Sequence, residues 1–470
     1  MGKKLKKHFS DIITRIKDVK KEGSFIQNIT YTISGNAYGI LLQLIFSPIL
    51  ARIYSPEAYG VFGLYMAVVA NISMFSLLML PNAFVIPKKE REFSRLLQLT
   101  LFLTIFSSLV VSTAFVFFGQ NIAKLFDHDG VQWWYYLVGP TVFLLGIIQI
   151  NSNWIVRLKL FKKTVKVGFV TGLVGRIFNL LYGILSKGSS IGLVIGELTG
   201  KLFGLFLQIR VIIGANYNLL FKSWSYKKMI WALKEFRSYP LFLLPGNYIN
   251  LLAGQLPIFL FASSFGFEMV GFYTFSLAML DMPLRLFGNA ISPVFTQKAA
   301  ETQNTNPERV GSITKDAFLK LLLAGLIPFG LLSAFGDYIF VFVFGNNWQM
   351  AGTICRLLSV FYLFRLAVSP ISSVLAIIRK EKYGLINSGL IFLLRVISLY
   401  IGIFIINDVL ITIALFSLAG IIAIFVLIFI IFSFLKQNPY SIIVKVFIWG
   451  SGSVIFFNSL RWVLNNLIFS

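Results

Sequence analysis

The stretch IFLLRVISLYIGIFII, residues 391–406, carries a single charge, Arg395, among aliphatic and aromatic side chains. A helix needs about 20 apolar residues to cross the roughly 30 Å hydrocarbon core of a bilayer. Similar runs recur along a chain that is 57% hydrophobic and 13% charged, whereas soluble domains have about 25% charged residues. Backbone groups find no partner in lipid, so such runs must be helices. A membrane β-barrel is excluded because its strands alternate over about ten residues. The sequence predicts an all-α polytopic membrane protein.

We expect twelve transmembrane helices, because twelve apolar runs are separated by short polar breaks. They cover 26–50, 59–86, 96–118, 133–155, 167–186, 190–212, 239–263, 270–296, 317–336, 353–378, 384–406 and 409–435. A further apolar stretch at 441–470 fits a thirteenth span, a short hairpin or an interfacial segment, and the pattern does not choose among them.

The positive charges indicate the topology. If the N-terminus lies in the cytoplasm, the segments on that side carry 32 of the 42 Lys and Arg residues. The segments on the other side carry only Arg52, Lys124 and Lys187. Cytoplasmic loops of membrane proteins are enriched in Lys and Arg, so this asymmetry supports a cytoplasmic N-terminus. It also explains most of the net charge of +24 without a nucleic-acid partner.

The N-terminal segment 1–25 is not a cleavable signal, because charges run through it and it contains no apolar h-region. Its apolar residues fall at helical spacing, which predicts a basic amphipathic helix on an anionic cytoplasmic leaflet. A disordered basic tail that only sets orientation is the alternative. The single cysteine, Cys355, excludes an intrachain disulfide and a cysteine metal cluster. Two histidines leave little for a zinc site or a general base, and we predict no metal, no cofactor and no enzymatic activity.

The break ARIYSPEAYG at 51–60 has a counterpart, SSFGFEMVG, at 263–271. Gly60 and Gly271 are 211 residues apart, and so are Glu57 and Glu268. Each half of the chain holds an even number of spans, so the repeat is parallel, with a pseudo-twofold axis along the membrane normal. Within the motif, Ser55 suits an N-cap, Pro56 the first helical position and Glu57 the first turn. We therefore interpret both motifs as helix starts.

The repeat divides the chain into five expected parts. They are a basic amphipathic segment (1–25), an N-terminal six-helix bundle (26–212), a cytoplasmic linker (213–238), a C-terminal six-helix bundle (239–435) and a hydrophobic C-terminal segment (436–470). In the sixth span, glycines recur every four residues and predict a face for close helix packing; they are Gly192, Gly196, Gly200 and Gly204.

Arg210 and Lys320 lie at the cytoplasmic ends of their spans and are counted with the loops. Eight further charged side chains fall inside the expected spans: Arg176, Glu197, Lys201, Asp281, Arg285, Arg356, Arg365 and Arg395. Each isolated charge at the bilayer centre costs about 2.5–3.5 kcal/mol on insertion scales, so these side chains must face a cavity or each other. Glu197–Lys201 and Asp281–Arg285 have i,i+4 spacing and are expected to pair. Arg356 lies near a helix start and is expected to extend toward the membrane surface.

Positive charge exceeds negative charge in these spans, and Arg176, Arg365 and Arg395 have no acidic residue within a helical turn. A buried guanidinium needs an anion, and its planar fork matches phosphate oxygens. The pseudo-symmetric Arg176 and Arg395 are expected to face one cavity from the two halves. We infer an anionic, phosphate-bearing substrate.

Three features resemble a known family: the segment GSFIQNITYTISGNAYGILLQLIFSPILARIYSPEAYGVFGLYMAVV (23–69), the two six-helix halves and IGELTGKLFG (195–204). The chain resembles the polysaccharide-transporter (Wzx-type) oligosaccharide flippases of the MOP superfamily. The resemblance implies the MATE-like fold, a cavity between two bundles, alternating access and proton or sodium coupling. It also implies the bacterial inner membrane, an undecaprenyl-diphosphate-linked oligosaccharide such as an O-antigen repeat unit as substrate, and polysaccharide polymerase machinery as a partner beside the membrane lipids.

Combining this resemblance with the charges assigns roles to the candidate residues. Five basic side chains are predicted to bind the anion: Arg176, Lys201, Arg285, Arg365 and Arg395. Glu197 or Asp281 is predicted to exchange the coupling ion and so release its basic neighbour. A small-molecule or drug antiporter of the same superfamily is the alternative, although a cationic substrate calls for acidic residues and aromatic faces. A membrane polymerase or glycosyltransferase would need larger extramembrane loops, and a scaffold would not need eight intramembrane charges.

Overall fold

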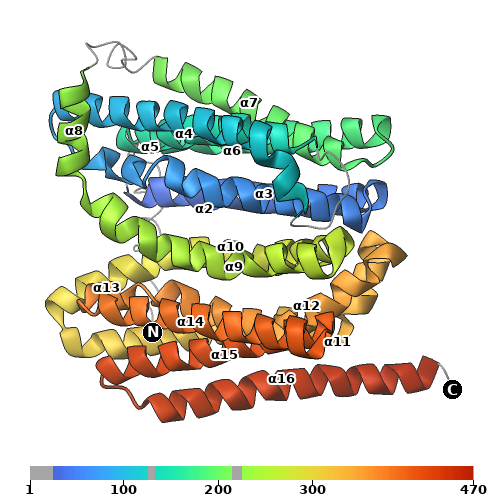
Figure 1. Cartoon of the computed structure of the whole chain (residues 1–470). Coiled ribbons are helices and arrows are strands. Elements are labelled where there is room, and N and C mark those ends of the chain that lie inside the picture. Colours follow the sequence, from blue (N-terminus) through green and yellow to red (C-terminus); the bar gives the residue numbers. More distant parts are fainter. Residues whose placement is uncertain (1–24, 125–132, 214–224, 469–470) are drawn as a thin grey trace, which may run out of the picture.

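The computed structural model describes residues 25–124, 133–213 and 225–468, and every regular element in these ranges is helical. Long helices lie side by side in two stacked groups (Figure 1). The first bundle contains α2 (Phe25–Ile53), α3 (Pro56–Ser76), α4 (Glu90–Lys124), α5 (Tyr135–Arg157), α6 (Phe161–Leu185) and α7 (Ser190–Ile213). The second bundle contains α9 (Leu244–Ser264), α10 (Gly266–Thr305), α11 (Val310–Phe344), α12 (Gln349–Val368), α14 (Glu381–Tyr400) and α15 (Val409–Phe434).

Short elements connect or extend the long helices. They are η1 (Leu80–Val85), α8 (Tyr226–Glu235), η3 (Tyr239–Leu243), η4 (Pro307–Arg309), η5 (Asn346–Trp348), η6 (Ser369–Ile371), α13 (Val374–Ile377) and η7 (Ile401–Ile406). The chain continues into α16 (Pro439–Ile468), beside the second bundle. The helix α8 runs across the ends of the first-bundle helices, beside α4, and the chain then leads into α9 of the second bundle (Figure 1). The predicted amphipathic segment 1–25 lies almost entirely outside the described residues. The predicted limits of the two six-helix bundles, 26–212 and 239–435, stay predictions.

Each of the twelve expected spans corresponds to one long helix, so the predicted all-α membrane fold is confirmed. Ten helices in the described ranges, α16 among them, are long and apolar enough to cross a membrane, and Tyr38–Ile53 of α2 is a shorter apolar helix. The helices α9 and α10 fall outside this group. They carry polar side chains such as Asn250, Gln255 and Asp281, which lower their hydropathy and line a cavity described below.

Several predicted boundaries were wrong. The second span, expected at 59–86, ends as an α-helix at Ser76; Leu78 and Met79 then adopt left-handed conformations, and η1 follows with Pro81 near its start. Other helices extend beyond the expected limits of their spans. For example, α11 reaches Phe344, past the expected limit at residue 336.

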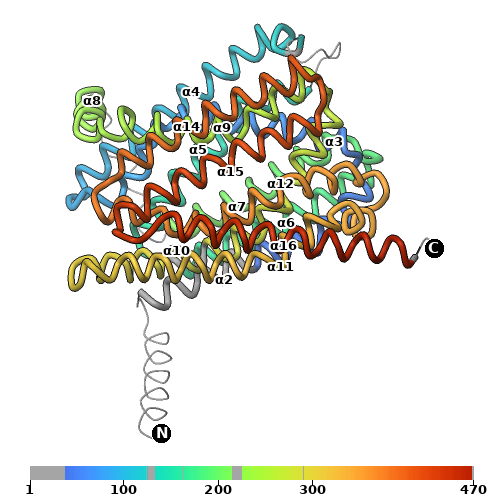
Figure 2. Tube along the Cα trace, turned by 90° about the horizontal axis from the view of Figure 1, so that it is seen from below, coloured from blue at the N-terminus to red at the C-terminus, as the bar shows by residue number. Residues whose placement is uncertain are grey.

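The apolar stretch near the C-terminus forms one continuous helix, α16, rather than a hairpin. Figure 2 shows α16 running along α11. Arg461 on α16 donates to both carboxylate oxygens of Asp337 on α11, at 2.7 and 3.1 Å, and Arg356 on α12 donates to the same carboxylate at 3.2 Å. The expectation that the side chain of Arg356 extends toward the membrane surface was therefore wrong. It belongs to an ion cluster that joins three helices.

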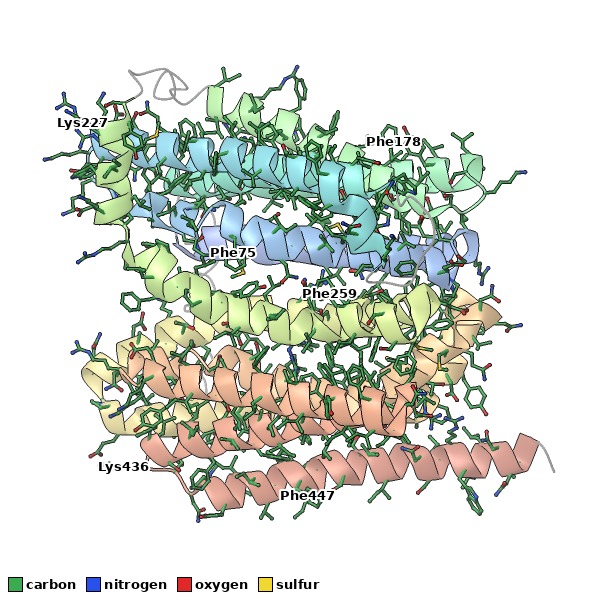
Figure 3. All side chains as sticks on the ribbon, viewed as in Figure 1. Phe75, Phe178, Lys227, Phe259, Lys436 and Phe447 are labelled. Carbon is green, nitrogen blue, oxygen red and sulfur yellow. The ribbon has the colours of Figure 1, made fainter. Side chains whose placement is uncertain are left out.

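The basic segments between helices gather at one end of the molecule, which we call the lysine-rich end. Lys227 on α8 and Lys436 after α15 both lie there (Figure 3). The opposite end holds the starts of α3, α7, α10 and α15. This separation agrees with the alternation of charge that the sequence predicted loop by loop.

The repeated motifs meet at the opposite end. The hydroxyl of Ser55 accepts a hydrogen bond from the Ala58 N–H at 3.2 Å, which confirms the predicted N-cap of α3. A Cβ placed on Gly60 would lie 1.7 Å from the carbonyl oxygen of Phe267, and one on Gly271 would lie 1.7 Å from that of Pro56. Pro56 and Phe267 have the same separation in sequence as the two glycines. The contact is therefore reciprocal, as a twofold axis requires, and we call this the crossing end.

Other contacts between the bundles surround this crossing. The indole N–H of Trp348 donates to the carbonyl of Ala51 at 2.8 Å, and its ring packs against Tyr59 and Phe275. Further inward, the amide of Asn71 on α3 donates to Gln255 on α9 at 2.5 Å. Figure 3 labels Phe75 and Phe259 on these two facing helices. The bundles are thus joined along α3, α9 and α10, and most firmly at the crossing end.

The glycine face of α7 packs against α6, as predicted. Gly192, Gly196, Gly200 and Gly204 are all buried. A Cβ on Gly200 would lie 2.6 Å from the Cα of Gly175 and 2.9 Å from the carbonyl oxygen of Thr171. Backbone lies against backbone here, so a side chain cannot be accommodated by a rotamer change.

We predict that Gly200→Leu destabilises the protein by about 1–3 kcal/mol, because overpacking forces α6 and α7 apart. The measurement is thermal unfolding of the detergent-purified protein. Gly168→Leu on α6 is the matched control, because no atom lies within 4 Å of a Cβ at that position. Equal unfolding temperatures for the two variants would contradict the packing role.

Candidate functional site

A cavity of about 400 Å³ lies within the second bundle, between α9, α10, α12, α14 and α15. Its wall combines amide, phenol, carboxylate and guanidinium groups with apolar side chains. The polar members are Asn250, Gln255, Tyr273, Asp281, Tyr362, Arg365 and Arg395. Binding cavities typically hold a few convergent polar groups in an apolar wall, so this cavity is the candidate site.

A second cavity of about 500 Å³ adjoins the first, because both are lined by Asn250, Arg365, Ile391 and Ile424. Its other lining residues include Glu381, in the first turn of α14, at the lysine-rich end. Together the two cavities form a polar chamber that runs from the lysine-rich end to Arg395 inside the bundle.

Asp281 and Arg365 form an ion pair across this chamber. The Nη1 of Arg365 lies 3.5 Å from the Oδ1 of Asp281, and both side chains are partly exposed. The expected pair between Asp281 and Arg285 was wrong: the described ion pairs join Asp281 to α12 rather than to the next turn of its own helix. The packing of α10 against α12 brings Asp281 to Arg365, so the i,i+4 spacing on α10 does not decide its partner. Arg365, predicted to lack an acidic residue within its own helix, finds one on α10.

Arg395 is the most buried of the predicted site residues, with 8% of its surface exposed. Its Nη1 donates to the carbonyl of Ala253 at 3.1 Å, and its guanidinium lies 4.4 Å from the ring centre of Phe416. Its Nε is buried with no hydrogen-bond partner. Among the described residues, no carboxylate lies within ion-pair distance of Arg395.

The contact between Arg395 and Ala253 has a local cause in α9. Residue 257, four positions after Ala253, is a proline inside the helix. Proline has no N–H, so the carbonyl of Ala253 loses its usual helical partner. Arg395 supplies the missing donor from α14. One corner of the guanidinium is therefore fixed to the backbone, and the remaining N–H groups are left for other acceptors.

A second charged group lies in the first bundle. Lys201 and Glu197 on α7 pair at 2.9 Å, as their spacing predicted. Arg176 on α6 donates to the carbonyl of Gly172 at 3.2 Å and interacts electrostatically with Glu197 and with Arg285, which comes from α10. No carboxylate in the described ranges lies within ion-pair distance of Arg176 or Arg285.

The predicted residues therefore form two groups, one in each bundle. Arg176 is not among the residues that line the chamber of Arg395, and a cavity shared by the two arginines stays a prediction. The helix α10 connects the groups, because it carries Asp281 toward one and Arg285 toward the other. Asp281 belongs to the chamber, and Arg285 is exposed within electrostatic reach of Arg176.

Sequence reasoning missed the uncharged members of the chamber. Asn250, Gln255 and Tyr273 give no signal of their own, because amides and tyrosines are common in polar and aromatic stretches of membrane helices. It also missed Asp337, which pairs with both Arg356 and Arg461, since Asp337 and Arg461 lie beyond the expected spans. In the described residues, no group of three or more His, Cys, Asp or Glu side chains is arranged to hold a metal ion.

This arrangement, two helical bundles around charged groups inside a membrane fold, defines a class of polytopic transport protein. The profile of the family described as "Polysaccharide biosynthesis protein" matches residues 49–352. Since this is more than half of the chain, the protein belongs to that family. No curated protein matches the sequence.

Solved structures share the fold. A structure described as "Lipid II flippase MurJ, inward closed conformation" superposes with a TM-score of 0.65 at 16% identity, covering 94% of this chain and 100% of that one. An inward-facing multidrug resistance MATE family transporter of the MOP superfamily gives 0.64 at 12% identity, with 92% and 98% covered. The MATE transporter ClbM in complex with Rb⁺ gives 0.55 at 15% identity, also with 92% and 98% covered. The expected MOP-superfamily fold is thus confirmed.

We predict that Arg395→Met changes the free energy of unfolding by no more than about 1–2 kcal/mol. Losing the bond to Ala253 costs about 1–3 kcal/mol, and removing a buried charge that lacks an anion offsets it. Thermal unfolding in detergent provides the measurement. Leu399→Ala on the same helix, where the side chain is fully buried, is the comparison; it should cost about 2–5 kcal/mol. A larger loss for Arg395→Met would show that the arginine is mainly structural.

Proposed function

We propose that this protein is a flippase for an undecaprenyl-diphosphate-linked oligosaccharide, an O-antigen or related polysaccharide repeat unit. It would move this lipid from the cytoplasmic to the periplasmic leaflet of the bacterial inner membrane by alternating access. The observation that carries the proposal is Arg395, a buried guanidinium in a polar chamber with an unpartnered N–H. Family membership supports the substrate class, since the family is one of polysaccharide biosynthesis proteins.

The charge balance favours a phosphate-bearing ligand. With Arg356 assigned to the cluster of Asp337, five basic side chains and two acidic ones remain in the two charged groups. A phosphate offers oxygens to Arg395 and Arg365 in the fork geometry that guanidinium groups prefer. A diphosphate could bridge further to Arg176, Lys201 or Arg285 when the bundles move relative to each other.

The uncharged lining suits a sugar. Asn250 and Gln255 offer both donors and acceptors for hydroxyl groups, and Tyr273 and Tyr362 present ring surfaces beside them. An oligosaccharide carries hydroxyls and apolar ring faces in alternation, so this wall matches it better than a purely charged wall would. The prenyl chain would stay in lipid.

The distribution of charge and the closed crossing end support the proposed direction of transport. The lysine-rich end faces the cytoplasm if the positive-inside rule holds, and the chamber extends toward that end. The crossing end is closed by Gly60, Gly271 and Trp348. Release into the other leaflet would require the bundles to separate there, as in hinge or rocking motions. Hand-over of the lipid to polysaccharide polymerase machinery would then occur on that side.

Coupling to protons or sodium would act through the two ion pairs. Neutralising Glu197 would release Lys201, and neutralising Asp281 would release Arg365, so a basic group becomes available to the anion in each case. Moving one charge through the membrane field is worth about 2.3 kcal/mol per 100 mV, which is enough to bias the cycle.

A drug antiporter is the second candidate, because MATE transporters share the fold about as closely as the flippase does. An organic cation would need acidic or open aromatic groups. In this chamber Asp281 is the acidic residue near the deepest part, and it is already paired with Arg365. The charges that line the chamber therefore favour a flippase for an anionic lipid over an antiporter for an organic cation.

We predict that Arg176→Glu combined with Arg395→Glu abolishes flipping while the protein still inserts. The reversed charges would repel a diphosphate in both bundles. The measurement is exposure of a lipid-linked oligosaccharide on the lumenal side of proteoliposomes, and Arg356→Met is the control outside the two charged groups. Unchanged flipping by the double variant would rule out the phosphate role.

We predict that Asp281→Asn and Glu197→Gln retain binding of the lipid-linked oligosaccharide but lose acceleration of flipping by an imposed ion gradient. Each change removes the group proposed to exchange the coupling ion while leaving the basic partner. The readout is the ratio of flipping rates with and without the gradient in proteoliposomes. If both variants keep the full wild-type ratio, coupling runs through other residues.

A further inference from the structure

A third cavity, of about 420 Å³, lies at the lysine-rich end and shares no lining residue with the chamber. It forms where the end of α10, the start of α14 and the turn between α15 and α16 come together. Its lining includes Gln303, Ile378, Lys380, Phe434, Lys436 and Gln437. The proposed transport cycle uses none of these side chains.

The two lysines in this cavity, Lys380 and Lys436, form no ion pair among the described residues. Lys380 places its ammonium 5.2 Å from the ring centre of Phe434. Lys436 adopts a left-handed backbone conformation (φ 54) in the turn after α15. In the described residues, neither ammonium has a carboxylate within ion-pair distance. Glu308 also lines the cavity, so the lining keeps a net positive charge.

The surroundings place this cavity at the boundary between lipid and water. The membrane-length helix α15 ends at Phe434, and α16 begins at Pro439. Beyond the turn, α16 exposes large apolar side chains, among them Tyr440, Val444 and Phe447 (Figure 3). Within the cavity itself, ammonium and amide groups lie beside the apolar side chains of Ile378, Phe434 and Leu435.

We propose that this cavity binds the headgroup of an anionic phospholipid. The phosphate lies between Lys380 and Lys436, the amides of Gln303 and Gln437 bind headgroup or glycerol oxygens, and the acyl chains run along α16. Basic pockets between transmembrane helices on the cytoplasmic side are known to hold such headgroups. A bound lipid would tie the start of α14 to the turn between α15 and α16.

The test is native mass spectrometry of the purified protein titrated with phosphatidylglycerol or phosphatidylcholine. We expect the wild type to bind phosphatidylglycerol more tightly. Lys380→Ala and Lys436→Ala should each weaken that binding about fivefold, the equivalent of about 1 kcal/mol for a lysine near the membrane surface. Lys382→Ala, beside the cavity but not in its lining, should bind as the wild type does. Lys380→Arg combined with Lys436→Arg should retain binding and shows that the site tolerates substitution.

Three outcomes would overturn the proposal. The double alanine variant could bind phosphatidylglycerol as tightly as Lys382→Ala does. Phosphatidylcholine could bind the wild type as tightly as phosphatidylglycerol. Inorganic phosphate could displace the lipid at equal concentration, which would identify a site for a soluble anion. Because binding rather than flipping is measured, none of these outcomes depends on the proposed transport function.

Discussion

The close approach of α3 and α10 at Gly60 and Gly271 determines how the two bundles are arranged. Each glycine lies against a carbonyl of the other helix, so any side chain there would separate the backbones. The contact is reciprocal, and the two motifs that form it are copies of each other in sequence. A pseudo-twofold axis therefore passes through or near this crossing. The aromatic packing of Trp348 against Tyr59 and Phe275 surrounds this crossing.

The second constraint is the cost of charge in lipid. The protein meets it in three ways. Glu197 and Lys201 neutralise each other on one helix, and Asp337 holds Arg356 and Arg461 between three helices. Arg395 instead uses a backbone carbonyl and an aromatic ring. The Asp337 cluster leaves little for a ligand, and the Glu197–Lys201 pair leaves Lys201 available only when Glu197 is neutralised, whereas Arg395 keeps donor capacity inside a cavity. The distribution of partners thus separates structural charges from candidate functional ones.

Much of the fold could be predicted from the sequence, because apolar run length and the placement of lysines follow directly from the properties of a bilayer. The Ser55 cap and the glycine face of α7 were also predictable, since both depend on local spacing. Pairing between helices was not. Asp281 pairs with Arg365, 84 positions away, and no local pattern indicates which of two basic residues a carboxylate will face. The electrostatic contact between Arg176 and Arg285 of the other bundle likewise depends on how the bundles pack.

Pro257 links the shape of a helix to the position of a charge. Its missing N–H frees the carbonyl that fixes Arg395, so a change in the bend of α9 would shift this carbonyl and redirect the guanidinium attached to it. Backbone geometry in one helix would then control how strongly a side chain of another attracts an anion. In the proposed alternating-access cycle, this linkage would let the chamber bind the anion tightly in one state and release it in the next.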